Sequence, residues 1–316
     1  MAKADLGTAD DLAMHTLALA LTNRCPLRCE YCCVPPGPGD LDEKIALSLI
    51  DQALELKVFS FIGFTGGEPL IRLPLISKLG TKLIGSGIVW GLTTGGGWAT
   101  SKKKVDDTIS SLVASGIGDI TVSVDSAHLR SKNKIWMPYF LEQLVSNKIP
   151  TTVSCTSNQR QPELPSFVTP SQFLKIEYHY VSPVGFALFS DLSGDNRLDF
   201  SNSCCPMKQS LTLSVWPNGD TYPCCSTYVV NKERDLLVGN AYRDTLKTLL
   251  RKALNDAYLI TIREVGFSGL SLLTADSDIW KQVLKDPLQD SCHLCSRIAK
   301  ASAVEDLRTK LENILR

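Results

Sequence analysis

Three cysteines in one short stretch constrain this chain more than any other feature of its sequence. Cys25, Cys29 and Cys32 lie in TNRCPLRCEYCC at C-x3-C-x2-C spacing, and an aromatic residue, Tyr31, directly precedes the third. A loop of this length can place three thiolates at three corners of an iron-sulfur cube, because cysteine thiolates are the usual ligands of such clusters. The fourth iron then has no protein ligand and stays open to a small molecule.

A structural zinc site is the alternative interpretation of this loop. Zinc in such sites takes four closed ligands, and Cys33 could be the fourth. Adjacent side chains of an extended or turn backbone point in different directions, so Cys32 and Cys33 would rarely reach one tetrahedral ion together. The iron-sulfur interpretation is therefore favoured, and it leaves Cys33 out.

Apolar runs alternate with helical patterns through the first two thirds of the chain. The patterns predict strands at 16–22, 58–64, 88–94, 119–125, 149–155 and 174–181, with helices opening at an Asp40–Glu43 capping box and near 71–86, 102–115 and 134–147. Repeated strand-helix units imply parallel strands with right-handed crossovers. We expect an α/β fold: a partial (β/α)6 TIM-like barrel over residues 1–190, then a small C-terminal iron-sulfur module, hairpin plus helix, over 191–316.

The loop after the second predicted strand reads GFTGGEPLIR and would lie beside the cysteine loop. Its glycines let the backbone approach a ligand closely, and Glu68 can accept a hydrogen bond from an ammonium group. With both motifs the chain resembles the radical SAM superfamily, in which the open iron binds S-adenosylmethionine (SAM) and an electron from the cluster yields a 5'-deoxyadenosyl radical. The resemblance implies that SAM contacts the GGEP motif and the aromatic residue of the cysteine loop: Tyr31, Gly66, Gly67, Glu68 and Pro69.

Further SAM contacts follow from the same resemblance. The strand TVSVDS is similar to the family's fourth strand, which nominates Ser123 and Asp125, although a strand-end cap is the alternative. In the third strand Thr93-Thr94-Gly95 stands where the family often has Thr-Asn-Gly, and Thr94 is the candidate there. VSPVG, which begins at Val181, resembles the loop on the adenine side, or it forms a simple turn.

A second cysteine set follows residue 203, in CCPMKQSLTLSVWPNGDTYPCCS and SCHLCSR. LTLSVWPNGDTYPC predicts a hairpin with Asn218-Gly219 at its turn. The set resembles the auxiliary-cluster modules called SPASM and twitch, which implies one auxiliary 4Fe-4S cluster; a zinc ribbon is the alternative. The expected ligands are Cys205, with Cys204 as its alternative, Cys224, Cys292 and Cys295.

The Cys224-Cys225 doublet divides by role. Successive side chains of an extended segment face opposite ways, so when Cys224 binds iron Cys225 faces elsewhere. A free thiol beside a substrate cavity can give a hydrogen atom to a carbon radical. This PCC arrangement resembles radical SAM peptide epimerases, which implies that Cys225 is catalytic; a buried small hydrophobe is the alternative.

The resulting expectation is L-to-D epimerisation of a residue in a ribosomally made peptide. Peptide cross-linking, as thioether or carbon-carbon bond formation, or oxidation is the alternative within the enzyme class. A zinc- or cluster-binding structural protein is the alternative from another class. The expected partners are a precursor peptide and a reductant such as flavodoxin or ferredoxin. Because only about two dozen residues precede Cys25, we expect the peptide to be held by the barrel, its loops or a separate protein.

Composition limits the partners. Lys+Arg and Asp+Glu both count 33 in 316 residues, and no basic block stands out, so nucleic acid is not expected. The start lacks a basic region, and no apolar run approaches the ~20 residues that span a bilayer, which predicts a cytoplasmic protein without membrane contact. Eleven cysteines without a secretion signal favour metal or redox work over a disulfide framework. Apolar spacing from Ile298 to Ile314 predicts a last helix packed on the barrel.

Overall fold

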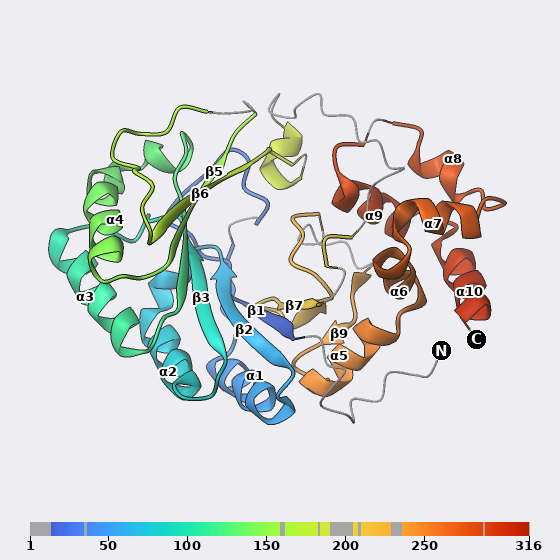
Figure 1. The fold of residues 1–316 in the computed structure, drawn as a ribbon, viewed down its shortest axis with the longest axis horizontal. Helices are drawn as coiled ribbons and strands as arrows, with labels where there is room; N and C mark the ends of the chain where they lie inside the picture. Colours follow the sequence, from blue (N-terminus) through green and yellow to red (C-terminus); the bar gives the residue numbers. More distant parts are fainter. Residues whose placement is uncertain are drawn as a thin grey trace.

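The computed structural model describes residues 14–34, 37–158, 162–182, 184–189, 205–207, 210–228, 236–286 and 288–315. Within these residues the strands form one nine-stranded sheet in the order β6-β5-β4-β3-β2-β1-β7-β8-β9. Figure 1 shows the first strands curving into a partial barrel with helices on its outer side, and the C-terminal helices grouped across the opening.

The six predicted barrel strands are present and pair in parallel, each with its chain neighbour. The α/β partial barrel is thus confirmed. Between β5 and β6 the described residues, 157–158 and 162–173, form no α-helix, so the last connection departs from the full (β/α)6 pattern. The elements are β1 (His15–Thr22), α1 (Glu43–Leu56), β2 (Phe59–Gly66), η1 (Pro69–Arg72), α2 (Leu73–Leu83), β3 (Val89–Thr94), α3 (Lys102–Ala114), β4 (Asp119–Ser123), η2 (His128–Arg130), η3 (Lys132–Trp136), α4 (Met137–Ser146), β5 (Thr151–Thr156), β6 (Leu174–His179) and η4 (Gly185–Phe189).

The first helix begins two residues later than the capping box predicts. Asp42 is the N-cap, and its side chain accepts hydrogen bonds from the backbone N–H groups of Lys44 and Ile45. The carboxylate of Asp40 is instead taken by Thr22 and Arg24, at 2.6 and 2.9 Å. The prediction of Asp40 as the cap is therefore wrong, because a tertiary ion pair outcompetes the local cap.

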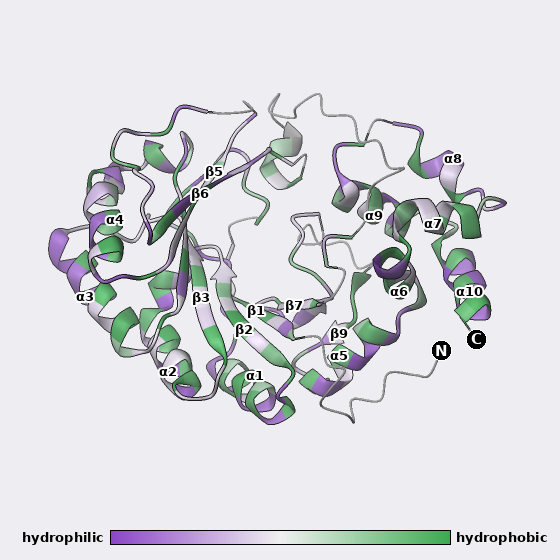
Figure 2. Ribbon diagram, viewed as in Figure 1, coloured by the Kyte–Doolittle hydropathy of each residue, from purple (hydrophilic) through white to green (hydrophobic). Residues whose placement is uncertain are grey.

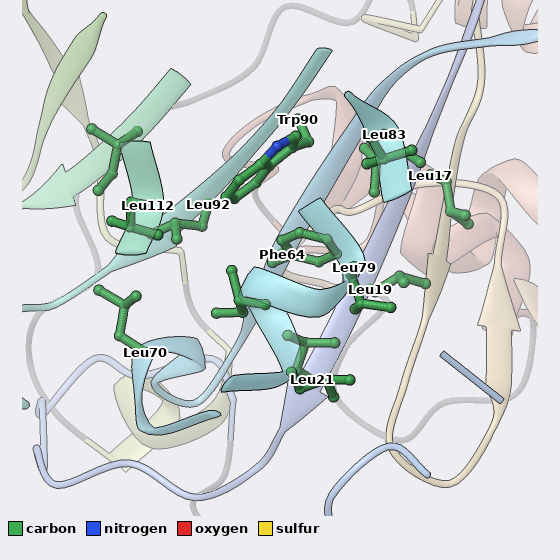
Figure 3. Packing of buried hydrophobic residues seen from close by; sticks show 14 of the residues in the cluster. Leu17, Leu19, Leu21, Phe64, Leu70, Leu79, Leu83, Trp90, Leu92 and Leu112 are labelled. Carbon is green, nitrogen blue, oxygen red and sulfur yellow. The ribbon is translucent and has the colours of Figure 1, made fainter. Parts of the chain in front are cut away.

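The barrel core lies between the sheet and its helices. Figure 3 shows Phe64 and Trp90 among leucines of β1, β3, α2 and α3. The two rings have centroids 5.5 Å apart, and Trp90 donates its indole N–H to the carbonyl of Ser115 at 3.0 Å. Hydrophobic residues are frequent along β2, whereas hydrophilic residues mark β6 and parts of α3 and α10 (Figure 2). This packing holds the carboxyl ends of the strands in a fixed frame.

The predicted hairpin is present as β7 (Thr212–Val215) and β8 (Asp220–Tyr222), with Gly219 at a φ of +82°. The N–H of Gly219 donates to the carbonyl of Trp216 at 2.7 Å. However, β7 also pairs in parallel with β1, so the hairpin extends the barrel sheet. The predicted boundary at residues 190 and 191 lies outside the described residues.

The C-terminal part holds more helix than the single one predicted. Its own hydrophobic cluster includes Tyr258, Phe267, Leu294 and Leu311. The last helix packs on α6 and α9, not on the barrel, because Leu307 and Leu311 are buried in this second cluster. None of the described helices is long and apolar enough to cross a membrane. The remaining elements are β9 (Gly239–Asn240), α5 (Leu246–Asn255), α6 (Ala257–Glu264), α7 (Gly266–Leu273), α8 (Ile279–Val283), α9 (Ser291–Lys300) and α10 (Val304–Leu315).

Candidate active site

The three-cysteine loop follows the carboxyl end of β1 and is held by its surroundings. Arg24, in this loop, forms a bidentate pair with Asp40, and Thr22 donates to the same carboxylate. Cys25, Cys29 and Cys32 belong to one small cluster with Leu27 and Tyr31. Burial raises the pKa of Cys25 to about 11.

The two glycines of the GGEP motif let the β2 loop touch the cysteine loop. The N–H of Gly67 donates to the carbonyl of Thr22 at 2.6 Å, and the N–H of Glu68 donates to the carbonyl of Arg24 at 2.9 Å. A Cβ atom on Gly66 would lie 2.3 Å from the Thr22 carbonyl oxygen, and one on Gly67 would lie 2.3 Å from that of Arg24. Both glycines also line the cavity described below. Their small size is therefore required by loop-to-loop packing, whatever they contact in the cavity.

Glu68 has 0 % of its surface exposed and points into the protein. Its carboxylate accepts hydrogen bonds from the N–H of Leu70 (3.1 Å), the hydroxyl of Thr94 (2.9 Å) and the N–H of Gly95 (3.0 Å). Burial raises its pKa to about 7, against the effect of these donors. Glu68 thus joins the end of β2 to the end of β3, and its contact with SAM stays a prediction.

Tyr31, Asp125 and His128 form a hydrogen-bonded group at the end of β4. The hydroxyl of Tyr31 donates to Asp125 and lies 3.1 Å from Nδ1 of His128, which lies 2.9 Å from the Asp125 carboxylate. Burial alone would lower the pKa of His128, but hydrogen bonds and negative charge from Asp125 and Cys29 raise it to about 10. Sequence reasoning missed His128; the spacing D-x-x-H just after the fourth strand was the available signal.

A cavity of about 620 Å³ opens over the cysteine loop at the carboxyl ends of the strands. Thr227 and Asp290, from the C-terminal part, also line it, which the sequence did not predict. Among the described residues, the predicted SAM contacts that are buried and do not line this cavity are Glu68, Pro69, Thr94, Asp125 and Val181. The predicted site residues that do line it are Cys25, Cys29, Tyr31, Cys32, Gly66, Gly67 and Ser123.

The second cysteine set is brought together by the hairpin and α9. Cys205, Cys224 and Cys295 pack against the second hydrophobic cluster, and Cys292 lies on α9 one turn before Cys295. Burial raises the pKa of Cys292 to about 11 and that of Cys295 to about 12. Cys204 lies outside the described residues, so the choice between it and Cys205 stays open.

Cys225 differs from its neighbour. Its residue surface is exposed, whereas Cys224 is partly covered and packs against the second hydrophobic cluster. Burial raises the pKa of the Cys225 thiol. Cys225 does not itself line the 620 Å³ cavity, but Thr227, two residues further on, does.

The donor sets fit iron-sulfur clusters in their chemistry. Each site offers cysteine sulfur, the usual ligand of such clusters. No three His, Cys, Asp or Glu side chains within the described ranges already surround a point where one metal ion could bind. Thiolates of a cube-shaped cluster bind separate iron atoms, so they need not meet at one point.

Comparison with known proteins gives both sequence and fold relatives. Residues 19–146 match the family model "Radical SAM superfamily". "Putative peptide biosynthesis protein YydG" of Bacillus subtilis (strain 168) is 21% identical over 301 residues, which cover 90% of this chain and 91% of that protein.

Two solved structures share the fold at low identity. "Native anSMEcpe with bound AdoMet and Cp18Cys peptide" is 14% identical with a TM-score of 0.58, covering 95% of this chain and 99% of that one. Streptococcus suis SuiB bound to precursor peptide SuiA is 14% identical with a TM-score of 0.56, covering 81% and 71%. The match to the radical SAM superfamily thus covers residues 19–146, the segment that carries the three-cysteine loop and strands β2 to β4.

Proposed function

We propose that this radical SAM enzyme epimerises an L-residue of a ribosomally made peptide. The observation that carries the proposal is the shared cavity. It is lined by Cys25, Cys29 and Cys32, and also by Thr227 and Asp290, which lie two residues from Cys225 and Cys292 in the chain. A substrate held there would contact the loop proposed to make a radical and the segments next to the exposed thiol proposed to end it.

The lining of the cavity suits a peptide. Hydroxyl groups of Ser123, Ser154 and Thr156 stand at the ends of β4 and β5, and no lysine or arginine is among the described lining residues. Such hydroxyl groups can hydrogen-bond the amide groups of a peptide. The relative named for peptide biosynthesis and the two peptide-bound structures of the same fold support a peptide substrate.

The residues would divide the work as follows. Cys25, Cys29 and Cys32 would hold a 4Fe-4S cluster, which with SAM supplies a 5'-deoxyadenosyl radical able to remove the Cα hydrogen. The S–H bond of Cys225 then breaks as a new Cα–H bond forms on the opposite face, and Cys225 is left as a sulfur radical. One electron and one proton restore its thiol. A flavodoxin- or ferredoxin-type reductant supplies this electron and the one that each SAM cleavage consumes.

The second cysteine set is the reason that peptide cross-linking or oxidation is the other candidate reaction. Cys205, Cys224, Cys292 and Cys295 would hold an auxiliary 4Fe-4S cluster, and a redox centre near the substrate can accept an electron from a carbon radical. Such a reaction removes two hydrogens from the peptide, whereas epimerisation removes none in sum. The mass of the product therefore separates the two candidates.

The test uses the precursor peptide encoded by a short open reading frame beside this gene, with reconstituted enzyme in heavy water. We expect one deuterium at Cα of a D-residue, 5'-deoxyadenosine, and no loss of two hydrogens. Cys225→Ala should still form 5'-deoxyadenosine but no D-residue. Cys155→Ala, which removes a buried thiol outside the cavity, should behave as wild type. An unchanged yield of D-residue from Cys225→Ala would refute the role of Cys225.

A further inference from the structure

The hydroxyl group of Tyr258 lies within hydrogen-bond distance of the sulfur of one predicted cluster ligand. It lies on α6, and 0 % of its surface is exposed. Its hydroxyl lies 3.2 Å from Sγ of Cys295 and 3.3 Å from the carbonyl oxygen of the same residue. Both distances permit a hydrogen bond, so the single proton of the phenol can go to either atom.

The packing of the C-terminal helices fixes this hydroxyl. Tyr258 belongs to the same buried cluster as Leu294 and Ile298, which lie on α9 together with Cys295. Asp256 caps α6 by accepting the N–H of Leu259 at 2.9 Å, so the helix that carries Tyr258 has a defined start. A buried tyrosine needs a partner for its hydroxyl, and both partners recorded for this one belong to Cys295.

We propose that Tyr258 is a positioning residue of the second cysteine site: it donates to the Cys295 sulfur and makes a cluster bound there easier to reduce. The inference rests on the proposed function, in which Cys295 is a cluster ligand. A metal-bound cysteine is a thiolate, and a negatively charged sulfur attracts the proton more strongly than the neutral carbonyl does. Hydrogen bonds to ligand sulfurs stabilise the more negative, reduced cluster, which raises its reduction potential.

The Tyr258 hydroxyl acts on one ligand of the second site. Two other predicted ligands have their own donor, because Ser226 donates its backbone N–H to the Cys224 sulfur and its hydroxyl to the Cys292 sulfur. Ser214 donates to the carbonyl oxygen of Cys224 at 2.7 Å. The potential of this site bears on the proposed reaction, because Cys225, which needs an electron after each hydrogen return, is the chain neighbour of Cys224.

The experiment is an anaerobic redox titration followed by electron paramagnetic resonance on reconstituted wild type and Tyr258→Phe. The variant should keep the iron content of wild type and show an auxiliary midpoint potential shifted to more negative values, with the potential of the first cluster unchanged. Tyr139→Phe is the matched control: it removes a hydroxyl that donates to Asp106 at 2.6 Å on the barrel helices, and both potentials should stay as in wild type. An unshifted auxiliary potential in Tyr258→Phe overturns the inference.

A second measurement needs no variant. Electron-nuclear double resonance of wild type reconstituted in H2O and in D2O should detect an exchangeable proton coupled to the reduced auxiliary cluster, and its absence contradicts the inference. The potentials are measured without peptide, so they can shift as expected even when no D-residue forms; in that case the proposed reaction alone is wrong. A protein that cleaves SAM but binds only one cluster per chain overturns the inference and leaves the first site intact.

Discussion

The two cysteine sites of this molecule are assembled in different ways. The first takes all its thiols from one short loop, which is fixed by backbone contacts from the neighbouring strand end and by the ion pair of Arg24 with Asp40. The second collects its thiols from the segment before β7, the end of the hairpin and α9, and the second hydrophobic cluster packs against three of them. A site made by one loop depends on local backbone geometry, whereas a site made by distant segments depends on the packing that joins them.

The sharpest way to separate the sites is to remove one thiol from the loop. Cys29→Ala should abolish 5'-deoxyadenosine formation, because the predicted site then keeps only two of its three ligands. The signal of the auxiliary cluster should remain, since its ligands come from other segments. Product analysis together with electron paramagnetic resonance checks both statements. Loss of both clusters in Cys29→Ala would show that the sites do not assemble independently.

The reciprocal change removes one thiol from the second cysteine site. Cys295→Ala should lower the iron content of the reconstituted protein by about half, because one of the two proposed four-iron clusters would be lost. Cys225→Ala should keep the full iron content, since Cys225 is exposed and Cys224 is the predicted ligand. Iron and sulfide assays on matched preparations decide the result. Equal iron loss in the two variants would reverse the assignment within the doublet.

The loop-to-loop contact of the first site can be tested by a single methyl group. Gly67→Ala should lower the free energy of unfolding by about 4 kcal/mol, because its Cβ would lie 2.3 Å from a backbone carbonyl that cannot move aside. Gly63→Ala, on β2 just before this loop, is the control, since its Cβ would meet only the Phe61 ring, at 3.4 Å, within 4 Å. Denaturant unfolding gives both values. If the two substitutions cost the same, the contact between the loops is not tight.

The hydrophobic support of the second site should respond to a core cavity. Leu294 is fully buried on α9, between Cys292 and Cys295 in the chain. Leu294→Ala should lower the free energy of unfolding of the protein by about 3 kcal/mol. Leu272→Ala, at a residue that is 81% exposed, should change stability by less than about 0.5 kcal/mol. Thermal unfolding measures the difference. The first cluster should form normally in both variants, and its loss in Leu294→Ala would contradict the separation of the two sites.

Much of the barrel could be predicted from patterns along the chain. Strand and helix periodicity located β1 to β6 and the helices after the first four strands, because each element buries its own apolar face. Contacts between distant residues could not be predicted in this way. Asp40 serves Arg24 and not the helix cap, Glu68 bonds to Thr94, and His128 meets Tyr31 across 97 residues.

The sequence by itself determined the cysteine spacing, the glycines that a close backbone approach requires, and the turn at Gly219, since all of these are local. Only the tertiary structure decided that β7 joins β1, and that Thr227 and Asp290 complete the cavity over the first cysteine loop. It also placed the Tyr258 hydroxyl on Cys295. The physical reason is that strand pairing and side-chain packing act between segments far apart in the chain, where spacing carries no information. The spacing of the cysteines indicates the chemistry of their loop, whereas the cavity above the loop is formed by residues that only the fold brings together.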